Sequence, residues 1–247
     1  MTDFFYRGCP KDITGIQSIL LSLDEKFSCN NHDGNPNAPE EFLYVDNNSY
    51  VCLSAPHATR HPRLLYQGPG DPIKPSDIWT GALTEYIASQ QKWSYIVRAK
   101  RGDALIKDFI LKKGLEDHFF LDIHGMKDGN GFDLAVGTGR LEETDYTQEL
   151  EHIHTLANKY GITYVINDRH YRGRKGLTGQ LQEVTERPSA LQFEFSPNYV
   201  DVLTFNAVQK TLAFITELGQ CLEKDRQPRK LCDFEQYTPS QTPSPSE

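Results

Sequence analysis

Short apolar runs alternate along the chain with longer segments in which apolar residues recur every three or four positions. An apolar run of about six residues is typical of a strand buried on both faces, and the longer spacing is typical of a helix that packs along one stripe. The predicted strands are 50–55, 93–99, 118–123, 132–136, 162–167 and 190–195, and the predicted helices are 77–90, 102–113, 143–160 and 198–222. This alternation predicts an α/β fold in which helices cover both faces of a sheet.

The chain has 247 residues and no central linker rich in Pro, Gly or Ser, which favours one folded domain. We expect this domain to span 1–225, with 1–45 as an irregular segment that contains a helical turn. The segment 226–247 ends rich in Pro, Ser and Gln, and it has too few apolar residues to offset the entropy of ordering, so we expect a disordered tail. Either Ser76 or Asp77 is placed to cap the first predicted helix.

Composition argues against two classes of partner. With 38% hydrophobic and 24% charged residues and no apolar run near the ~18 residues of a membrane span, the chain predicts no membrane partner. A formal net charge of −8 argues against a nucleic-acid partner, because such binding depends on clustered Lys and Arg. The five cysteines include no C-x-x-C pair, which indicates reduced thiols. We therefore expect a cytoplasmic protein.

One basic stretch, RHYRGRKG at 169–176, departs from the acidic balance. It is either a solvated loop or a loop that meets an anionic substrate. In the second case Arg172 and Arg174 are the candidate substrate-binding residues.

Two histidines follow apolar strands, where an open α/β sheet places its binding crevice. His57 comes directly after Pro56, which ends a strand, and such an imidazole is either structural or a metal ligand. Asp122 and His124 are two apart at the end of another strand, so their side chains share a face. A carboxylate there orients a metal-bound histidine, binds the metal itself or forms a plain polar pair. We expect a metal site with Asp122 behind His124.

A glutamate lies in the apolar strand ALQFEF, where polar and apolar residues alternate. A buried carboxylate is rarely left unpaired, so Glu194 either forms an ion pair with Arg98 or Arg101 or has a function. The functional interpretation is a general base whose pKa is raised by burial and which takes a proton from a metal-bound water.

Two acidic residues compete to complete a set of two histidines and one carboxylate, the pattern that leaves a fourth zinc position open for water. Asp77 lies at a helix start and Glu85 lies eight residues further on. We prefer Asp77, because a helix terminus that faces the crevice is better placed than a residue in mid-helix.

Two arginines, Arg98 and Arg101, follow another predicted strand. Arginine suits a two-point grip on a substrate carboxylate, and an ordinary surface role is the alternative. Both are also the first candidates to stabilise a tetrahedral oxyanion, and we expect Arg101 in that catalytic role.

Five segments, taken in order, resemble the N-formylglutamate amidohydrolase family: SAPH at 54–57, SDIWTGAL at 76–83, LDIHGM at 121–126, FDLAVGTG at 132–139 and ALQFEFS at 190–196. The resemblance spans roughly residues 50 to 200. It implies a phosphorylase/hydrolase-like fold, a three-layer α/β/α sandwich with a mixed, mostly parallel central sheet. It also implies zinc carboxypeptidase-like chemistry with one catalytic Zn²⁺ per chain.

Position by position, the resemblance implies that His57, Asp77 and His124 bind the metal and that Glu194 serves as base and acid. It therefore selects Asp77 over Glu85. The chain departs from the family at Thr59, where a Gly is usual, and at Lys100, where an Asn is usual. Both positions are expected near the substrate, so the catalytic class carries over more readily than the specific substrate.

The predicted function is zinc-dependent hydrolysis of a C–N amide bond in an N-acyl amino acid or a related substrate that carries a carboxylate. Glu194 activates the metal-bound water. Two alternatives stay open: a metallopeptidase acting on a peptide or modified amino acid, and a non-catalytic binding protein of the same fold.

Overall fold

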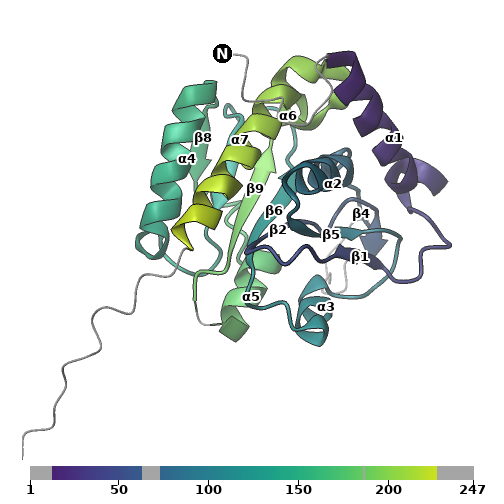
Figure 1. Ribbon diagram of the computed structural model, residues 1–247, viewed down its shortest axis with the longest axis horizontal. Coiled ribbons are helices and arrows are strands. Elements are labelled where there is room, and N and C mark those ends of the chain that lie inside the picture. The colour runs from purple at the N-terminus through teal and green to yellow at the C-terminus, as the bar shows by residue number, and fades with distance from the viewer. Residues whose placement is uncertain (1–12, 63–72, 186, 227–247) are drawn as a thin grey trace, which may run out of the picture.

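A computed structural model describes residues 13–62, 73–185 and 187–226, and its centre is a seven-stranded sheet (Figure 1). Across the sheet the strands are β1 (Phe42–Val45), β5 (Ser94–Arg98), β2 (Val51–Ala55), β6 (Phe119–Gly125), β9 (Ala190–Phe195), β7 (Leu134–Gly137) and β8 (Tyr164–Ile166). Strands β5, β2, β6 and β9 are parallel, β1 is antiparallel to β5, and β7 is antiparallel to β9 but parallel to β8. The sheet is therefore mixed and mostly parallel.

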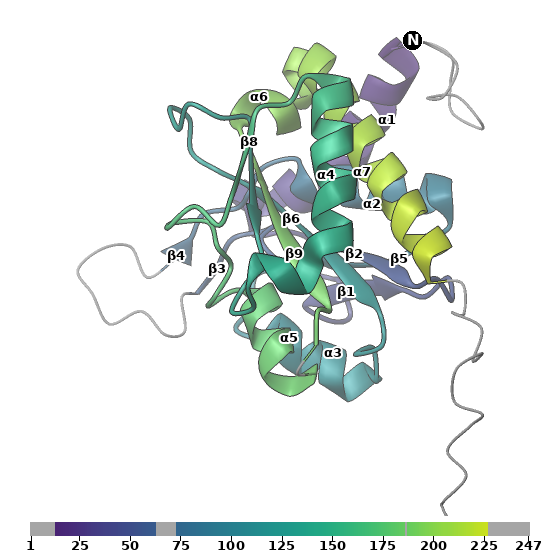
Figure 2. The same ribbon diagram turned by 90° about the vertical axis from the view of Figure 1, so that its left-hand side faces the viewer.

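Helices cover both faces of this sheet, as Figure 1 and the perpendicular view in Figure 2 show. Helices α1 (Ile13–His32), α2 (Thr80–Gln91), α4 (Thr147–Tyr160) and α7 (Phe205–Asp225) pack on one face, and α3 (Ile106–Lys113) and α5 (Leu177–Thr185) pack on the other. The short elements are η1 (Glu143–Tyr146), α6 (Pro197–Val200) and η2 (Val202–Thr204). The three layers are the α/β/α sandwich that the sequence predicts. No helix in the described ranges is long and apolar enough to cross a membrane.

Alternation along the central strands divides the core into two clusters. Leu53, Leu121 and Phe193 lie in the larger cluster with α1, α2, α4 and α7. Cys52 and Phe120 lie in the smaller one with α3 and α5. This period of two explains why the strands read as continuous apolar runs, because both faces are covered.

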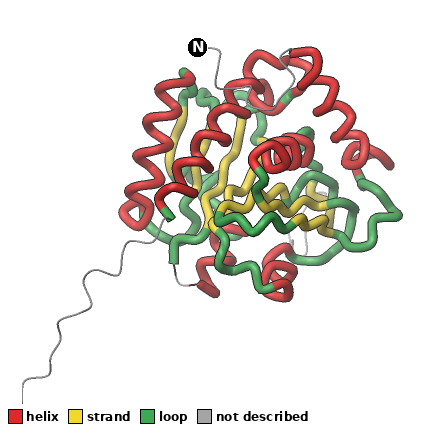
Figure 3. Tube along the Cα trace, in the orientation of Figure 1, coloured by secondary structure: helices red, strands yellow, loops and turns green. Residues whose placement is uncertain are grey.

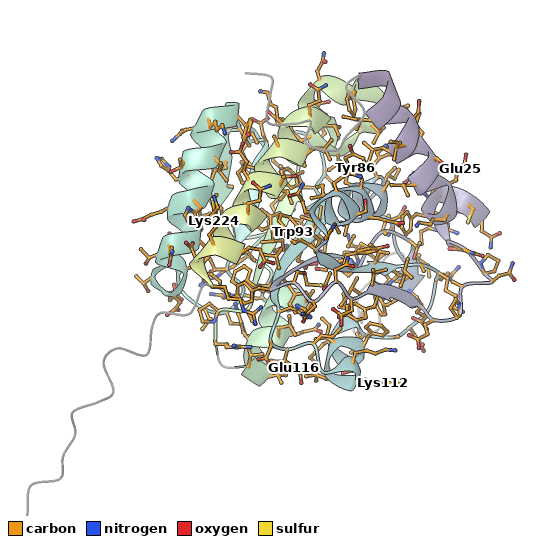
Figure 4. The ribbon with its side chains drawn as sticks, viewed as in Figure 1. Glu25, Tyr86, Trp93, Lys112, Glu116 and Lys224 are labelled. Carbon is orange, nitrogen blue, oxygen red and sulfur yellow. The ribbon has the colours of Figure 1, made fainter. Side chains whose placement is uncertain are left out.

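Close packing in the larger cluster depends on a glycine in α7. A Cβ at Gly219 would overlap the indole ring of Trp93, which is 4% exposed and lies against this helix (Figure 4). The long helix therefore approaches the sheet closely where the chain turns into β5.

The face shared with α3 and α5 becomes polar towards the carboxyl ends of the parallel strands. Ser54, Asp122 and Gln192 lie in one row across β2, β6 and β9, and His124 and Glu194 lie opposite each other in the next row. The switch from apolar to polar side chains marks the edge of the sheet where the candidate site lies.

All six predicted strands are present with small shifts at their ends, and strands are yellow in Figure 3. The sequence prediction missed β1, β3 (His61–Pro62) and β4 (Ile73–Lys74), which Figure 2 labels. The helical turn expected in the irregular segment is the long α1, with non-helical backbone at 29–31. Helix α5 was not predicted. The expected tail beyond residue 226 lies outside the described residues.

The expected helix cap is wrong. Trp79, in a left-handed conformation with φ of 71°, is the residue before α2, and no side chain caps the helix there. Asp77 has other hydrogen-bond partners, described below.

Candidate active site

Three predicted ligands come together from distant parts of the chain. His57 follows β2, Asp77 precedes α2, and His124 lies near the end of β6. The ring centroids of His57 and His124 are 4.8 Å apart. The backbone N–H of Asp77 donates to the carbonyl of His57 at 2.7 Å, which ties the two loops together. The structure therefore brings the two imidazoles and the carboxylate to one place.

The imidazole of His124 lies between two carboxylates. Its Nε2 is 2.9 Å from Oδ2 of Asp122, and its Nδ1 is 3.1 Å from Oδ2 of Asp77. Ser54 Oγ donates to the other oxygen of Asp122 at 2.6 Å, and Lys74 Nζ donates to the other oxygen of Asp77 at 3.0 Å. Asp122 is fully buried and makes these contacts from behind His124, as an orienting residue would.

These neighbours set the protonation of the cluster. Burial opposes a charge on His124, but the two carboxylates raise its pKa well above the ordinary value. Burial would raise the pKa of Asp77, yet His124 and Lys74 lower it below the ordinary value. The two carboxylates, Asp122 more than Asp77, therefore favour the form of His124 that carries hydrogen on both ring nitrogens.

A third imidazole, absent from the sequence prediction, completes the cluster. His61 Nε2 is 2.6 Å from Nδ1 of His57, and His61 Nδ1 is 2.9 Å from the carbonyl oxygen of Pro62. Burial, with nearby cationic groups, lowers the pKa of His57 well below its usual value and lowers that of His61 to about 4. The signal was the second histidine of HATRH, four positions after the first.

Glu194 on β9 lies opposite His124 in the register of the two strands. Its Oε1 accepts a hydrogen bond from Gln192 Nε2 at 2.9 Å. Burial raises the pKa of Glu194 to about 7, opposed by His124 and assisted by the negative charge of Asp77. A carboxyl group whose pKa lies near neutrality, opposite an imidazole, suits general base chemistry.

The ion pairs considered as the alternative for Glu194 form elsewhere. Arg98 is 3% exposed and pairs with Glu41 at 3.1 Å, and Arg101 lies 3.5 Å from Asp33. Neither arginine therefore neutralises Glu194.

Arg98 has a structural role instead of the predicted grip on a substrate. Besides Glu41, its guanidinium donates to the carbonyl oxygens of Pro56, Gly102 and Ala104. It also lies over the ring of Phe42, 4.3 Å from the centroid. Because Pro56 precedes His57, this buried cation fixes the turn that carries the first histidine.

The other predicted neighbours also have partners within the protein. Glu85 forms an ion pair with Lys26, away from the histidines. Thr59 is fully buried against Gly34, and Lys100 donates to a carbonyl oxygen of the segment 35–40 at 2.6 Å. The two positions that depart from the resembling family therefore contact the N-terminal segment.

The basic stretch lies beside the polar row of the sheet. A Cβ at Gly137 would lie 2.5 Å from the carbonyl oxygen of Tyr171, and a Cβ at Gly173 would lie 2.8 Å from Oε1 of Gln192. Arg172 donates to the carbonyl oxygen of Gly139 and so shapes the neighbouring turn. This loop therefore packs against Gln192, which donates a hydrogen bond to Glu194.

The last predicted substrate-binding residue is Arg174, whose side chain is exposed.

No group of three or more His, Cys, Asp or Glu side chains in the described ranges has the arrangement of a metal site as it stands. The donors of this cluster are instead hydrogen-bonded in pairs, His57 with His61 and His124 with Asp77. The residue types are those that bind zinc in catalytic sites.

Comparison with known proteins supports the fold. No family model matches the chain, and no curated protein matches its sequence. N-formylglutamate amidohydrolase from Ralstonia eutropha JMP134 is similar in structure, with a TM-score of 0.50 and 12% identity over 75% of this chain and 99% of that chain. Bacteriophage poly-gamma-glutamate hydrolase has a TM-score of 0.49 and 13% identity, over 74% and 90% of the two chains. A zinc-free form of YNDL has a TM-score of 0.45 and 14% identity, over 78% and 94%. The chain therefore shares its fold with the N-formylglutamate amidohydrolase.

Proposed function

We propose that this protein is a zinc-dependent amidohydrolase that cleaves the amide bond of an N-acyl amino acid or a related small substrate with a carboxylate. The observation that carries this proposal is the convergence of His57, Asp77 and His124, with Glu194 opposite His124 on the adjacent strand. The likeness in fold to an N-formylglutamate amidohydrolase supports it.

Two separations within the cluster match those expected between ligands of a single ion. Two donors bound to one zinc at about 2.0–2.1 Å with tetrahedral angles lie about 3.3 Å apart, and their imidazole centroids lie about 5 Å apart. His124 Nδ1 and Asp77 Oδ2 are 3.1 Å apart, and the centroids of His57 and His124 are 4.8 Å apart. Binding an ion would displace a proton from His124, so metal affinity would rise with pH.

The chain supplies the remaining chemistry around this ion. When bound, zinc would lower the pKa of a water molecule and polarise the amide carbonyl. Asp122 holds His124 through Nε2, which leaves Nδ1 on the side of Asp77. Glu194 takes the proton of the attacking water and returns it to the leaving amine, and a pKa of about 7 suits both transfers.

The position of the cations suggests how a substrate carboxylate is recognised. Arg98 is committed to the fold and Arg172 to the loop, so Arg174 is the better candidate to meet the carboxylate. Arg101, predicted near the oxyanion, pairs with Asp33, whereas Lys74 is the cation in contact with a proposed ligand, Asp77.

The decisive experiment combines metal analysis with a substitution at Glu194. The purified protein is expected to contain about one zinc per chain and to hydrolyse N-formylglutamate or another N-acyl amino acid. Glu194→Gln should keep the metal and lose at least 100-fold in kcat, in the range expected for removal of a general base. Glu151→Gln, at an exposed position on α4, is the matched control.

Each outcome separates the candidate functions. Turnover of short peptides but not of N-acyl amino acids would identify a peptidase. A folded protein that binds no metal and turns over no substrate would indicate a binding protein. Activity of Glu194→Gln within tenfold of the parent would remove Glu194 from the role of base.

A further inference from the structure

We infer that His61 is a positioning residue that fixes the tautomer of His57, so that Nε2 is the metal-binding nitrogen of His57. This inference rests on the proposed metal site. The chain of contacts runs from the carbonyl oxygen of Pro62 to His61 Nδ1, and from His61 Nε2 to His57 Nδ1.

The two imidazoles meet edge to edge. Their planes are inclined by only 8° and their centroids are 4.7 Å apart, while the two facing nitrogens are 2.6 Å apart. Rings stacked face to face would keep all their atoms about 3.5 Å apart. The nitrogens are closer than that, so the rings lie nearly in one plane, the geometry of an N–H···N hydrogen bond.

The direction of this hydrogen bond follows from the carbonyl oxygen of Pro62. A carbonyl oxygen only accepts, so the hydrogen between it and His61 must lie on Nδ1 of His61. A neutral imidazole has one N–H, so Nε2 of His61 is the acceptor and Nδ1 of His57 is the donor. The second nitrogen of His57, Nε2, then keeps its lone pair and is available to an ion.

The same distance shows that His61 is not itself a fourth ligand through this nitrogen. Two nitrogens on one zinc would be about 3.3 Å apart, and those of His57 and His61 are 2.6 Å apart. His61 therefore acts through His57, as carbonyl oxygens and carboxylates act through other metal-bound histidines.

The β3–β4 hairpin provides one residue that contacts His57 and one that contacts Asp77, two of the proposed metal ligands. His61 on β3 is the register partner of Lys74 on β4. His61 contacts His57, and Lys74 donates to Asp77 at 3.0 Å. A short element outside the main sheet thus positions one imidazole and one carboxylate of the proposed set.

The test reads the tautomer directly in the full-length protein without metal. Long-range ¹H–¹⁵N correlation spectra of ¹⁵N-histidine-labelled protein show which ring nitrogen carries the hydrogen. We expect His57 as the Nδ1–H form in the parent. His61→Asn, which is too short to reach, should lose this preference, and His61→Gln should restore it because its carbonyl oxygen accepts the hydrogen bond.

Zinc affinity, measured by competition with a chelator, is the second readout. We expect His61→Asn to bind zinc 10- to 100-fold more weakly than the parent, and His61→Gln to bind within about threefold of it. His118→Asn, at a histidine whose imidazole contacts the carbonyl oxygen of Ser49 and the ring of Phe120, is the control and should change neither readout.

Two results would overturn the inference. One is a parent spectrum in which His57 is the Nε2–H form, and the other is a folded His61→Asn protein with unchanged zinc affinity. If the parent binds no metal, the proposed function fails, but the spectrum of the metal-free protein still decides the tautomer.

Discussion

Replacing Glu194 by Gln should stabilise the metal-free protein at alkaline pH. The pKa of Glu194 is raised from 4.5 to about 7, mainly by burial. This difference corresponds to about 3 kcal/mol between the two protonation states. The folded protein binds this proton more tightly than the unfolded chain does. The contribution of Glu194 to the free energy of unfolding is therefore fully present below pH 4.5, the unfolded pKa, and is lost as the pH rises through about 7, the folded pKa. Glutamine keeps an oxygen for the hydrogen bond from Gln192 and carries no charge.

The assay is urea unfolding of EDTA-treated protein at pH 4.5 and at pH 8. At pH 8 we expect Glu194→Gln to unfold with a free energy higher by up to about 3 kcal/mol, and at pH 4.5 we expect nearly equal values. Glu151→Gln, at an exposed position, should match the parent at both pH values. Equal stability of Glu194→Gln and the parent at pH 8 would mean that the carboxylate is ionised without penalty. Glu194 would then not be a base whose pKa burial raises to about 7.

Three further substitutions test other parts of the site. Asp122→Asn places an amide donor against His124 Nε2, which favours the tautomer with hydrogen on Nδ1, so zinc affinity in a chelator competition should fall 10- to 100-fold while the circular dichroism spectrum is unchanged. Arg98→Ala removes a buried cation with four hydrogen-bond partners and should destabilise the protein by about 3–5 kcal/mol in urea unfolding, and a loss under 1 kcal/mol would contradict its structural role. Gly137→Ala should displace the backbone at Tyr171 and cost about 1–3 kcal/mol, and an unchanged melting temperature would show that the loop gives way freely.

The sheet and its main helices could be predicted from the sequence because their signals are local. Strands covered on both faces are continuous apolar runs, and the apolar positions of α7 recur at helical spacing. Helix α1, predicted only as a helical turn, carried the same signal along its length, since Ile16, Leu20 and Phe27 are buried. The neighbouring polar run from 30 to 37 concealed it. Strand β1 is only four residues long at the sheet edge, where the apolar requirement is weaker.

The part of the candidate site that lies on the sheet was predictable for a related reason. Asp122, His124 and Glu194 lie at the ends of strands, so the period of two decides which face they share. Their polar character interrupts runs that are otherwise apolar, and the cost of burying such groups without a partner makes them stand out.

The roles of the two arginines could not be predicted from their positions along a strand. Arg98 and Arg101 follow a strand just as the ligands do, but their partners, Glu41 and Asp33, come from the N-terminal segment. A long side chain reaches partners that spacing along its own strand does not reveal. Lys74 and His61 were missed for a different reason, because strands of two residues leave no periodic pattern.

The site therefore combines two kinds of support. Strands β6 and β9 carry His124 and Glu194, and their register in the central sheet fixes the imidazole against the proposed base. His57 and Asp77 lie on loops, where packing constrains side chains less. Both loop residues receive a hydrogen-bond partner from the β3–β4 hairpin, and the turn at His57 is further held by a buried arginine. Changes in the hairpin should therefore alter metal affinity more than global stability, whereas changes in β6 or β9 should alter both.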